Sequence, residues 1–458
     1  QQKAVRNKSQ YVTLDDGTLG LLPHSWMERL AAFFFAAEIV GEDLRTPHTH
    51  FDAIAQMYQE DELDHQVKEV IQNYRQKLTT LEAIRPVATP RGLQAQLRHY
   101  QQQGLAWLNF LDDHQLGGVL ADDMGLGKTV QVIAFMLLLK EKGHSETHLL
   151  VVPTSLLFNW QVELRRFAPS LKVHIHHGAG RKKDNDSFPL FDLVLTTYGT
   201  LLSDIGYLRR FYFGYVFLDE SQQIKNPGAQ RYRATRMLQS RNKLAITGTP
   251  FENHTFDLYA QLSFACPGLL GDPAFFREVY STPIHKFGDN RRAVELQRKV
   301  APFILRRTKK DVTPELPDKT EQVLYCPMGD AQRAIYDAYE SDLRAYLEGQ
   351  LKDDILRNAI HVLRGLTQLR QICNDPRLLK ADYVQGEGSS KMEILMEQIQ
   401  SKAGHHKILV FSQFVAMLDL VRSELDKSGI QYPYLTGAVK DREGAVSQFQ
   451  NNPAVRVF

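Results

Sequence analysis

Cysteine is scarce in this sequence, which contains only Cys266, Cys326 and Cys373 among its 458 residues. The three show neither the spacing of a zinc site nor the even number expected of a disulfide framework. A disulfide-dense secreted scaffold is therefore excluded, and a reducing intracellular setting is the simplest interpretation.

Long hydrophobic runs are also lacking. No uninterrupted apolar stretch reaches the roughly 18 residues that a transmembrane helix needs, and the N-terminus lacks the apolar core of a signal peptide. The run AAFFFAA, from Ala31 to Ala37, is too short to span a bilayer and is typical of a buried helix face. We therefore expect a soluble chain. Because the first residue is Gln1 and not Met, we also expect a piece of a longer protein.

Net charge is small, at +2, so any binding to nucleic acid must come from a local cluster of charge. The clearest cluster runs from Arg291 to Lys310, where basic residues accompany one acidic residue, Glu295. Its density suits a surface that follows a phosphate backbone, although a solvated helix face is the alternative. The apolar content of 43% is enough for real cores, and the length predicts about two to four domains.

The most informative stretch that is present runs from Asp122 to Thr129, between a predicted strand at Gly118 to Leu120 and a predicted helix at Val130 to Lys140. Glycines let a backbone wrap an anion, a lysine reaches β- and γ-phosphates, and a threonine hydroxyl suits Mg²⁺. Asp122 stands where the general pattern has a glycine. The alternative is an ordinary strand-to-helix turn with an incidental lysine. The predicted ATP-binding residues here are Asp122, Asp123, Met124, Gly125, Leu126, Gly127, Lys128 and Thr129.

A second chemical signal is the acidic pair Asp219-Glu220, which directly follows the apolar segment YVFL. One carboxylate would bind Mg²⁺ together with Thr129, and we assign Asp219 to this role. The other would orient or deprotonate an attacking water. An isolated acidic pair is usually a solvated loop, but this pair ends a predicted strand of the same sheet as the phosphate loop.

Strand and helix patterns alternate from Leu93 onward, which predicts an α/β domain with a mainly parallel sheet. Ligands of such sheets gather at the carboxyl ends of the strands, where the polar motifs of this chain stand. The predicted strands are 118–120, 149–152, 173–177, 193–196, 215–218 and 243–247, and the polar residues at their ends include Thr154, Ser155, Thr197, Asp219, Glu220, Thr247, Gly248, Thr249 and Pro250.

The order of these motifs resembles that of SWI/SNF-type ATPases of helicase superfamily two. Joint order is more specific than any one motif. The resemblance rests on LRHYQ with Gly104 and Trp107-Leu108, DDMGLGKT, LLVVPTSLLFNW, LDESQQIKN, LAITGTPFEN, FILRRTKKDV with ELP, LRQICNDPRLL and ILVFSQF, and it covers roughly 93–458. The segment YVTLDDGTLGLLP is similar to the helicase-associated region of bacterial members.

This resemblance implies RecA-like P-loop NTPase lobes with helical insertions and a mostly helical N-terminal segment. The expected organisation is an N-terminal helicase-associated segment at 1–90, a first lobe at 91–300, an inter-lobe segment with protruding helices at 301–390, and an incomplete second lobe at 391–458. ATP would sit in a cleft between the lobes, with Gln101 reading adenine. A cytoplasmic, nucleoid-associated location is implied for a bacterial source, and a nuclear one for a eukaryotic source.

The partner implied by the resemblance is double-stranded DNA, bound without sequence preference, from which the motor would displace a protein. Strong salt dependence is expected, since each phosphate contact contributes roughly 0.9 to the salt slope. Gly248-Thr249-Pro250, with Thr247, would relay the nucleotide state to the DNA-contacting loops. For each candidate hydroxyl, a capping role is the alternative. The expected DNA-binding residues are Thr154, Ser155, Thr197, Lys225, Asn226, Arg306, Arg307 and Lys309.

Two departures from the family pattern qualify the expected catalytic set of Lys128, Asp219, Glu220 and Gln222. Gln222 stands where the family commonly has histidine, and it can still hydrogen-bond toward the γ-phosphate or motif III. The chain also stops before the motif that carries the arginine finger, a group worth about 10³ to 10⁵ in rate in related enzymes. We therefore expect nucleotide binding with poor hydrolysis. A DNA-binding fragment without turnover and a strand-separating DNA or RNA helicase remain the alternatives.

The first 85 residues carry weaker signals. Tyr11 to Leu22 predicts a hairpin around Asp16-Gly17, because glycine accepts the positive φ of such turns. Helices are predicted at 25–38, 51–58 and 60–81. In the second lobe we expect strands at 408–411, 432–435 and 454–458, with helices at 415–428 and 441–450 between them.

Overall fold

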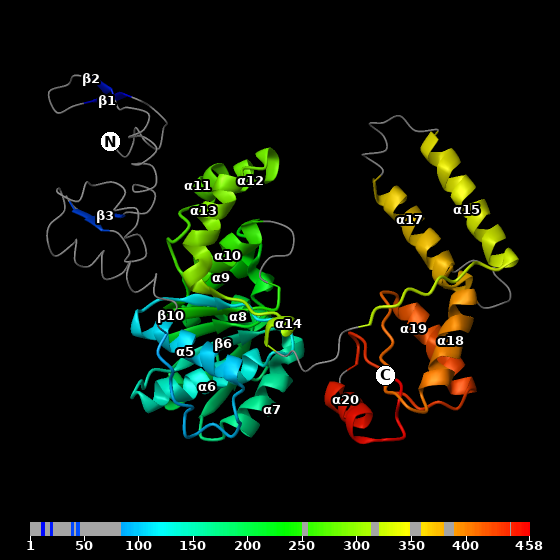
Figure 1. The fold of residues 1–458 in the computed structure, drawn as a ribbon, viewed down its shortest axis with the longest axis horizontal. Helices are drawn as coiled ribbons and strands as arrows, with labels where there is room; N and C mark the ends of the chain where they lie inside the picture. Colours follow the sequence, from blue (N-terminus) through cyan, green and yellow to red (C-terminus); the bar gives the residue numbers. More distant parts are fainter. Residues whose placement is uncertain are drawn as a thin grey trace. The chain divides into compact units, whose positions relative to one another are not determined.

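The computed structural model describes residues 11–13, 19–21, 38–40, 43–45, 84–249, 255–312, 320–348, 359–379, 389–439 and 441–458. The chain divides into two compact units, Gln1–Pro317 and Asp318–Phe458. Each unit is described by itself (Figure 1).

A seven-stranded sheet forms the centre of the first unit, in the order β11-β5-β10-β9-β6-β8-β7. All of its neighbouring strands pair in parallel, which confirms the predicted α/β class. The strands are β5 (Gly118–Leu120), β6 (His148–Val152), β7 (Val173–His176), β8 (Leu193–Thr197), β9 (Tyr212–Leu218), β10 (Gln239–Ile246) and β11 (Ile304–Leu305).

The six strands predicted for the first lobe all form, with ends that differ by a few residues. Strands β5, β6 and β8 are buried along their whole length, and apart from His148 at the start of β6 they consist of apolar or small residues. The seventh strand, β11, was not predicted, because two residues give no readable period. It pairs with β5, so the sheet continues past residue 300.

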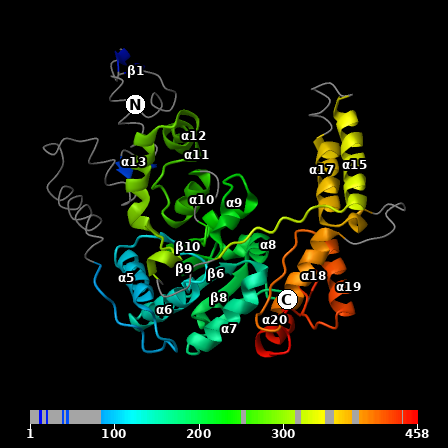
Figure 2. The same cartoon turned by 45° about the vertical axis from the view of Figure 1, so that its right-hand side comes forward.

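Helices cover both faces of the sheet. One layer contains α5 (His99–Asp113), α6 (Lys128–Glu141) and α7 (Leu157–Phe167), in which α6 packs against both of the others. The other contains α8 (Tyr198–Leu208), α9 (Gln230–Met237) and α10 (Thr255–Ala265). Figures 1 and 2 show the two layers on opposite sides of the strands. Because every strand is parallel, all carboxyl ends meet at one edge of the sheet.

Shorter elements complete the first unit. Strands β1 (Tyr11–Thr13) and β2 (Leu19–Leu21) form the predicted antiparallel pair, and β3 (Glu38–Val40) pairs with β4 (Asp43–Arg45). Glu38, expected to end a helix, begins β3; the rest of 25–38 and the helices at 51–58 and 60–81 lie outside the described residues. The remaining elements are η4 (Thr154–Leu156), η5 (Phe188–Leu190), η6 (Ser221–Ile224), α11 (Pro273–Phe276), η7 (Arg277–Ser281), α12 (Thr282–Phe287), α13 (Asn290–Val300), η8 (Ala301–Phe303) and α14 (Lys309–Val312).

The second unit is mostly helical where it is described. Helix α15 (Asp330–Glu348) packs against α17 (Ala359–Asn374), and α18 (Ser390–Lys402) packs against α19 (Val415–Lys427). Met392, Ile399 and Val421 belong to the core around α18 and α19. The remaining elements are η9 (Pro376–Leu378) and α20 (Arg442–Asn451).

The expected strands of the second unit are reduced to a single parallel bridge between Ile408 and Val457. The prediction of a strand at 432–435 was wrong. Pro433 has no N–H to give to a ladder, and the neighbouring tyrosines reach back to α19, Tyr432 to Asp426 at 2.9 Å and Tyr434 to Asp419 at 3.2 Å. The two helices predicted in this region do form, as α19 and α20.

Across the described ranges, none of the helices combines the length and apolar character needed to cross a membrane.

Candidate functional site

The phosphate loop joins β5 to α6 at the carboxyl edge of the sheet. Gly125 and Gly127 adopt positive φ angles of 87° and 72°, which L side chains rarely adopt. This turns the loop so that α6 begins at Lys128, directly after Gly127. The free backbone N–H groups of this helix end and its dipole both favour an anion.

Lys128 lies in the loop and hydrogen-bonds to it. Its Nζ donates to the carbonyl oxygens of Asp122 at 2.7 Å and Asp123 at 3.2 Å. Burial lowers the pKa of Lys128, while the carboxylates of Asp122, Glu220 and Asp219 oppose that shift. The Lys128 ammonium therefore hydrogen-bonds to the phosphate loop and interacts electrostatically with the carboxylates of Asp219 and Glu220. The phosphate loop and the acidic pair thus lie close to each other.

Asp219 is a buried carboxylate at the end of β9, with an exposed fraction of 8%. Its Oδ2 accepts a hydrogen bond from the indole Nε1 of Trp160 at 2.7 Å, and its Oδ1 accepts one from the backbone N–H of Glu220 at 2.9 Å. Burial raises the pKa of Asp219, and the hydrogen bond from Trp160 opposes that shift. Thr129 and Asp219 supply the hard oxygen donors that Mg²⁺ prefers, so this chemistry fits a magnesium ion.

A chain of hydrogen bonds runs from the acidic pair to the end of β10. The amide Nε2 of Gln222 donates to Oε2 of Glu220 at 2.6 Å, and its Oε1 accepts from the hydroxyl of Thr247 at 2.9 Å. The same hydroxyl oxygen accepts the backbone N–H of Thr249 at 3.0 Å. The side-chain amide of Gln222 thus connects Glu220 of the acidic pair to Thr247 at the end of β10.

Gly248 brings this segment against the phosphate loop. A Cβ at Gly248 would lie 2.7 Å from the Cγ of Met124, so any larger residue would require the Met124 side chain to shift. Pro250, the last residue of the predicted coupling segment, lies outside the described residues.

Gln101 lies behind the phosphate loop. Its Oε1 accepts the backbone N–H of Arg98 at 2.9 Å, and its Nε2 donates to the carbonyl oxygen of Leu126 at 3.2 Å. A Cβ at Gly127 would meet this Nε2 at 2.5 Å. Gln101 therefore contacts the loop directly, and its reading of adenine stays a prediction.

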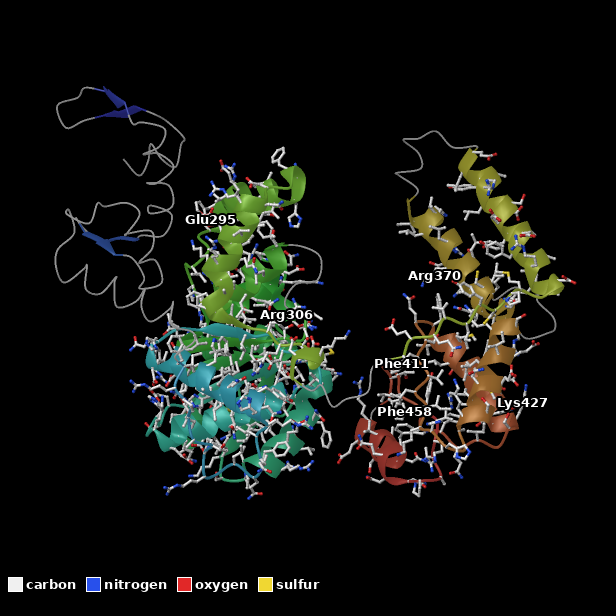
Figure 3. All side chains as sticks on the ribbon, viewed as in Figure 1. Glu295, Arg306, Arg370, Phe411, Lys427 and Phe458 are labelled. Atoms are coloured by element: carbon white, nitrogen blue, oxygen red, sulfur yellow. The ribbon has the colours of Figure 1, made fainter. Side chains whose placement is uncertain are left out.

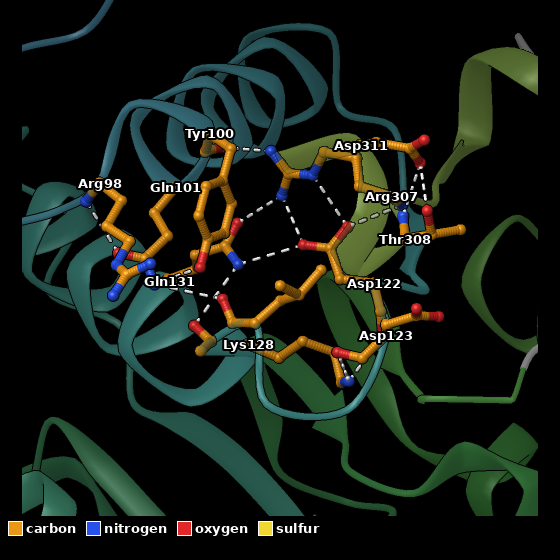
Figure 4. Close-up of polar contacts among 12 residues, drawn as sticks. Arg98, Tyr100, Gln101, Asp122, Asp123, Lys128, Gln131, Arg307, Thr308 and Asp311 are labelled. Carbon is orange, nitrogen blue, oxygen red and sulfur yellow. Dashed lines mark hydrogen bonds and ion pairs between the residues drawn. The ribbon is translucent and has the colours of Figure 1, made fainter. Parts of the chain in front are cut away.

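Arg307 clamps the start of the phosphate loop, an arrangement that sequence reasoning missed. Its guanidinium donates hydrogen bonds to both carboxylate oxygens of Asp122, at 2.5 Å to Oδ2 and 2.9 Å to Oδ1 (Figure 4). It also donates to Oε1 of Gln131 at 2.9 Å and to the carbonyl oxygen of Tyr100. Asp122 is fully buried, and Arg307 is its ion-pair partner. A Cβ at Gly104 would lie 1.9 Å from Oε1 of Gln131, so a glycine on α5 makes room for this network.

Comparisons with known proteins agree with the motif order. Residues 100–378 match the SNF2-related domain. The chain belongs to the SNF2-related family. The predicted family is thereby confirmed, and it is a family of ATP-dependent helicases and translocases.

Among curated SNF2 relatives, YwqA of Bacillus subtilis, named as an ATP-dependent helicase/translocase, is 36% identical over 82% of this chain and 42% of its own length. A protein of Mycoplasma genitalium described as an uncharacterized ATP-dependent helicase is 33% identical over 78% of this chain and 34% of its own length. The chain thus spans less than half the length of these relatives. A solved SWI2/SNF2 ATPase core of Sulfolobus solfataricus in complex with dsDNA is 38% identical, with a TM-score of 0.50, and the match covers 81% of this chain and 79% of that one.

The residues that the sequence predicts to contact DNA lie near strand ends of the first unit, but they differ in their exposure to solvent. Thr154, Ser155, Lys225, Asn226 and Arg306 are exposed (Arg306 is labelled in Figure 3). The exposed Lys309 donates its backbone N–H to Asp123 at 3.1 Å, and its side chain lies beside Gly125.

Two members of the expected DNA set have internal partners. Thr197 is buried, and its hydroxyl oxygen caps α8 by accepting the backbone N–H of Thr200 at 3.3 Å. Arg307 forms the clamp on Asp122. The basic cluster from Arg291 to Lys310 is also split, because its first part lies on α13 and its second part follows β11.

Proposed function

We propose that this protein is an ATP-driven motor that translocates along double-stranded DNA without separating the strands and displaces or remodels a bound protein. The family supports ATP-dependent activity, and the solved relative in complex with dsDNA supports the duplex as the track. The observation that carries the proposal is the hydrogen-bonded chain from Glu220 through Gln222 and Thr247 to Thr249, because a motor must link its hydrolytic group to a moving segment.

In this proposal the phosphate loop binds the polyphosphate of ATP. Residues from Asp122 to Thr129 surround it, and Lys128 exchanges its carbonyl contacts for the β- and γ-phosphates. Thr129 and Asp219 hold Mg²⁺, which would neutralise charge on the phosphate oxygens. Glu220 orients or deprotonates the attacking water, and Gln222 holds the Glu220 carboxylate from the side of Thr247.

The proposed DNA contact is electrostatic and independent of sequence. Arg306, Lys225 and Lys309 would supply charge, and Thr154, Ser155 and Asn226 would donate to phosphate oxygens. Arg307 and Thr197 have internal partners, so we assign them to the phosphate loop and to the cap of α8 instead. A motor of this kind would work on the nucleoid of a bacterium or in the nucleus of a eukaryote.

Two other functions remain distinguishable by experiment. A nucleotide-dependent DNA-binding protein without turnover would use the same phosphate loop. A strand-separating DNA or RNA helicase would use the same ATPase site but prefer a single strand as its activator.

The test is steady-state ATP hydrolysis with no nucleic acid, duplex DNA, single-stranded DNA or RNA, with Lys128→Ala as the blank. We expect low turnover without nucleic acid, which duplex DNA stimulates more than single-stranded DNA or RNA does. ATP binding without turnover above the blank would favour the binding protein, and stimulation by single-stranded DNA or RNA alone would favour the helicase.

A further inference from the structure

Trp160 lies on α7, and its side chain is buried. It donates its indole N–H to Oδ2 of Asp219 at 2.7 Å, although the two residues are 59 positions apart in the sequence. Helix α7 therefore contacts a residue that is assigned to magnesium.

The contact with Trp160 fixes the orientation of the Asp219 carboxylate. The other oxygen, Oδ1, already accepts the backbone N–H of Glu220 at 2.9 Å. Two N–H donors, one on each oxygen, prevent free rotation and leave further lone pairs for a cation. An indole N–H donates a hydrogen bond and has no lone pair to give, so Trp160 cannot bind a cation itself. Its role toward a cation is to position the ligand.

We propose that Trp160 is a positioning residue of the magnesium–nucleotide site, which holds Asp219 in the geometry that binds the cation. The inference rests on the proposed function, since it assumes that Asp219 is a ligand. Groups that orient a metal ligand typically contribute about 10- to 100-fold to metal affinity. Loss of this contact should therefore weaken magnesium binding and leave the metal-independent part of nucleotide binding intact.

The experiment measures binding of a fluorescent ADP analogue to the whole chain, by titration with Mg²⁺ and again in EDTA. Trp160→Phe removes the indole N–H and keeps an aromatic ring. Its matched control is Trp107→Phe, because Trp107 is also buried and donates its indole N–H to the carbonyl oxygen of Pro302 at 3.3 Å. We expect Trp160→Phe to raise the half-saturating Mg²⁺ concentration about 10-fold or more. The control should stay near wild type, and neither variant should change affinity in EDTA.

The outcomes separate this inference from the proposed function. If the wild-type chain binds the analogue without any dependence on Mg²⁺, the assignment of the magnesium site itself fails. If wild type depends on Mg²⁺ but Trp160→Phe behaves as Trp107→Phe does, the positioning role is overturned. Thermal unfolding without Mg²⁺ confirms that each variant is folded.

Discussion

At the scale of single residues, the arrangement around Asp122 joins distant parts of the first unit. Asp122 is fully buried, and the guanidinium of Arg307 is its ion-pair partner. A buried charge left without its partner costs far more than an exposed pair contributes, typically about 3 to 5 kcal/mol. Asp122 also replaces a glycine of the general phosphate-loop pattern, so the clamp explains why a carboxylate is tolerated at this position.

We therefore predict that Arg307→Ala lowers the free energy of unfolding of the first unit by about 3 kcal/mol. The neighbouring and exposed Arg306 is the matched control, and Arg306→Ala should change it by less than about 0.5 kcal/mol. Urea unfolding followed by tryptophan fluorescence reports on this unit, because all three tryptophans precede Pro317. Adding Asp122→Asn to Arg307→Ala should restore part of the loss. Equal stability of the two arginine variants would contradict the clamp.

The residues that form the phosphate loop and the acidic pair could be predicted from the sequence, whereas the distant residues that contact them could not. Lys128, Asp219 and Gln222 stand in motifs whose spacing predicts a phosphate loop and an acidic pair. The contacts of Trp160 with Asp219 and of Arg307 with Asp122 join residues far apart in sequence, and no local pattern announces them. The doublet of Arg306 and Arg307 looks like one basic feature, yet one side chain is exposed and the other lies over a buried carboxylate.

At the scale of elements, the parallel sheet brings separate motifs to one edge. Strands β5, β10 and β9 are neighbours, so the phosphate loop, Thr247 and the acidic pair follow adjacent strands. The carboxyl ends of these strands were predictable, because they are short buried apolar runs: GVL in β5, YVFL in β9 and LAI in β10. The two-residue strand β11 was not, and the predicted strand at 432–435 failed because its tyrosines contact α19.

The element-scale prediction concerns the link between β9 and β10. Thr247→Val removes the hydroxyl that donates to Gln222 and accepts from Thr249, while it keeps the volume of the side chain. We expect ATP affinity to stay within about twofold and stimulation of hydrolysis by duplex DNA to fall by up to about 10-fold, since one hydrogen bond in the link is worth about 1.4 kcal/mol or less.

The matched control is Thr196→Val, because Thr196 is also buried near the end of a strand and donates its hydroxyl to the carbonyl oxygen of His176 at 2.8 Å. It should leave the stimulation near that of wild type. A loss of stimulation in both variants, or in neither, would show that the link through Gln222 has no special part in coupling.

At the scale of the whole molecule, a first unit that carries the proposed ATP site is followed by a second unit that is mostly helical where it is described. The sequence predicted the family, because the motifs occur in a fixed order along the chain. It could not predict how little strand pairing the second unit would contain, because parallel strands depend on partners distant in sequence. Movement of one unit against the other during the ATP cycle is the step by which we propose that the protein advances along DNA.

The most direct measurement is displacement of a third strand from a DNA triplex by the protein and ATP, with the underlying duplex labelled to report any strand separation. We predict ATP-dependent release of the third strand, an intact duplex, and no release by Lys128→Ala. ATP hydrolysis stimulated by duplex DNA without release of the third strand would contradict translocation, and separation of the duplex would show a helicase instead.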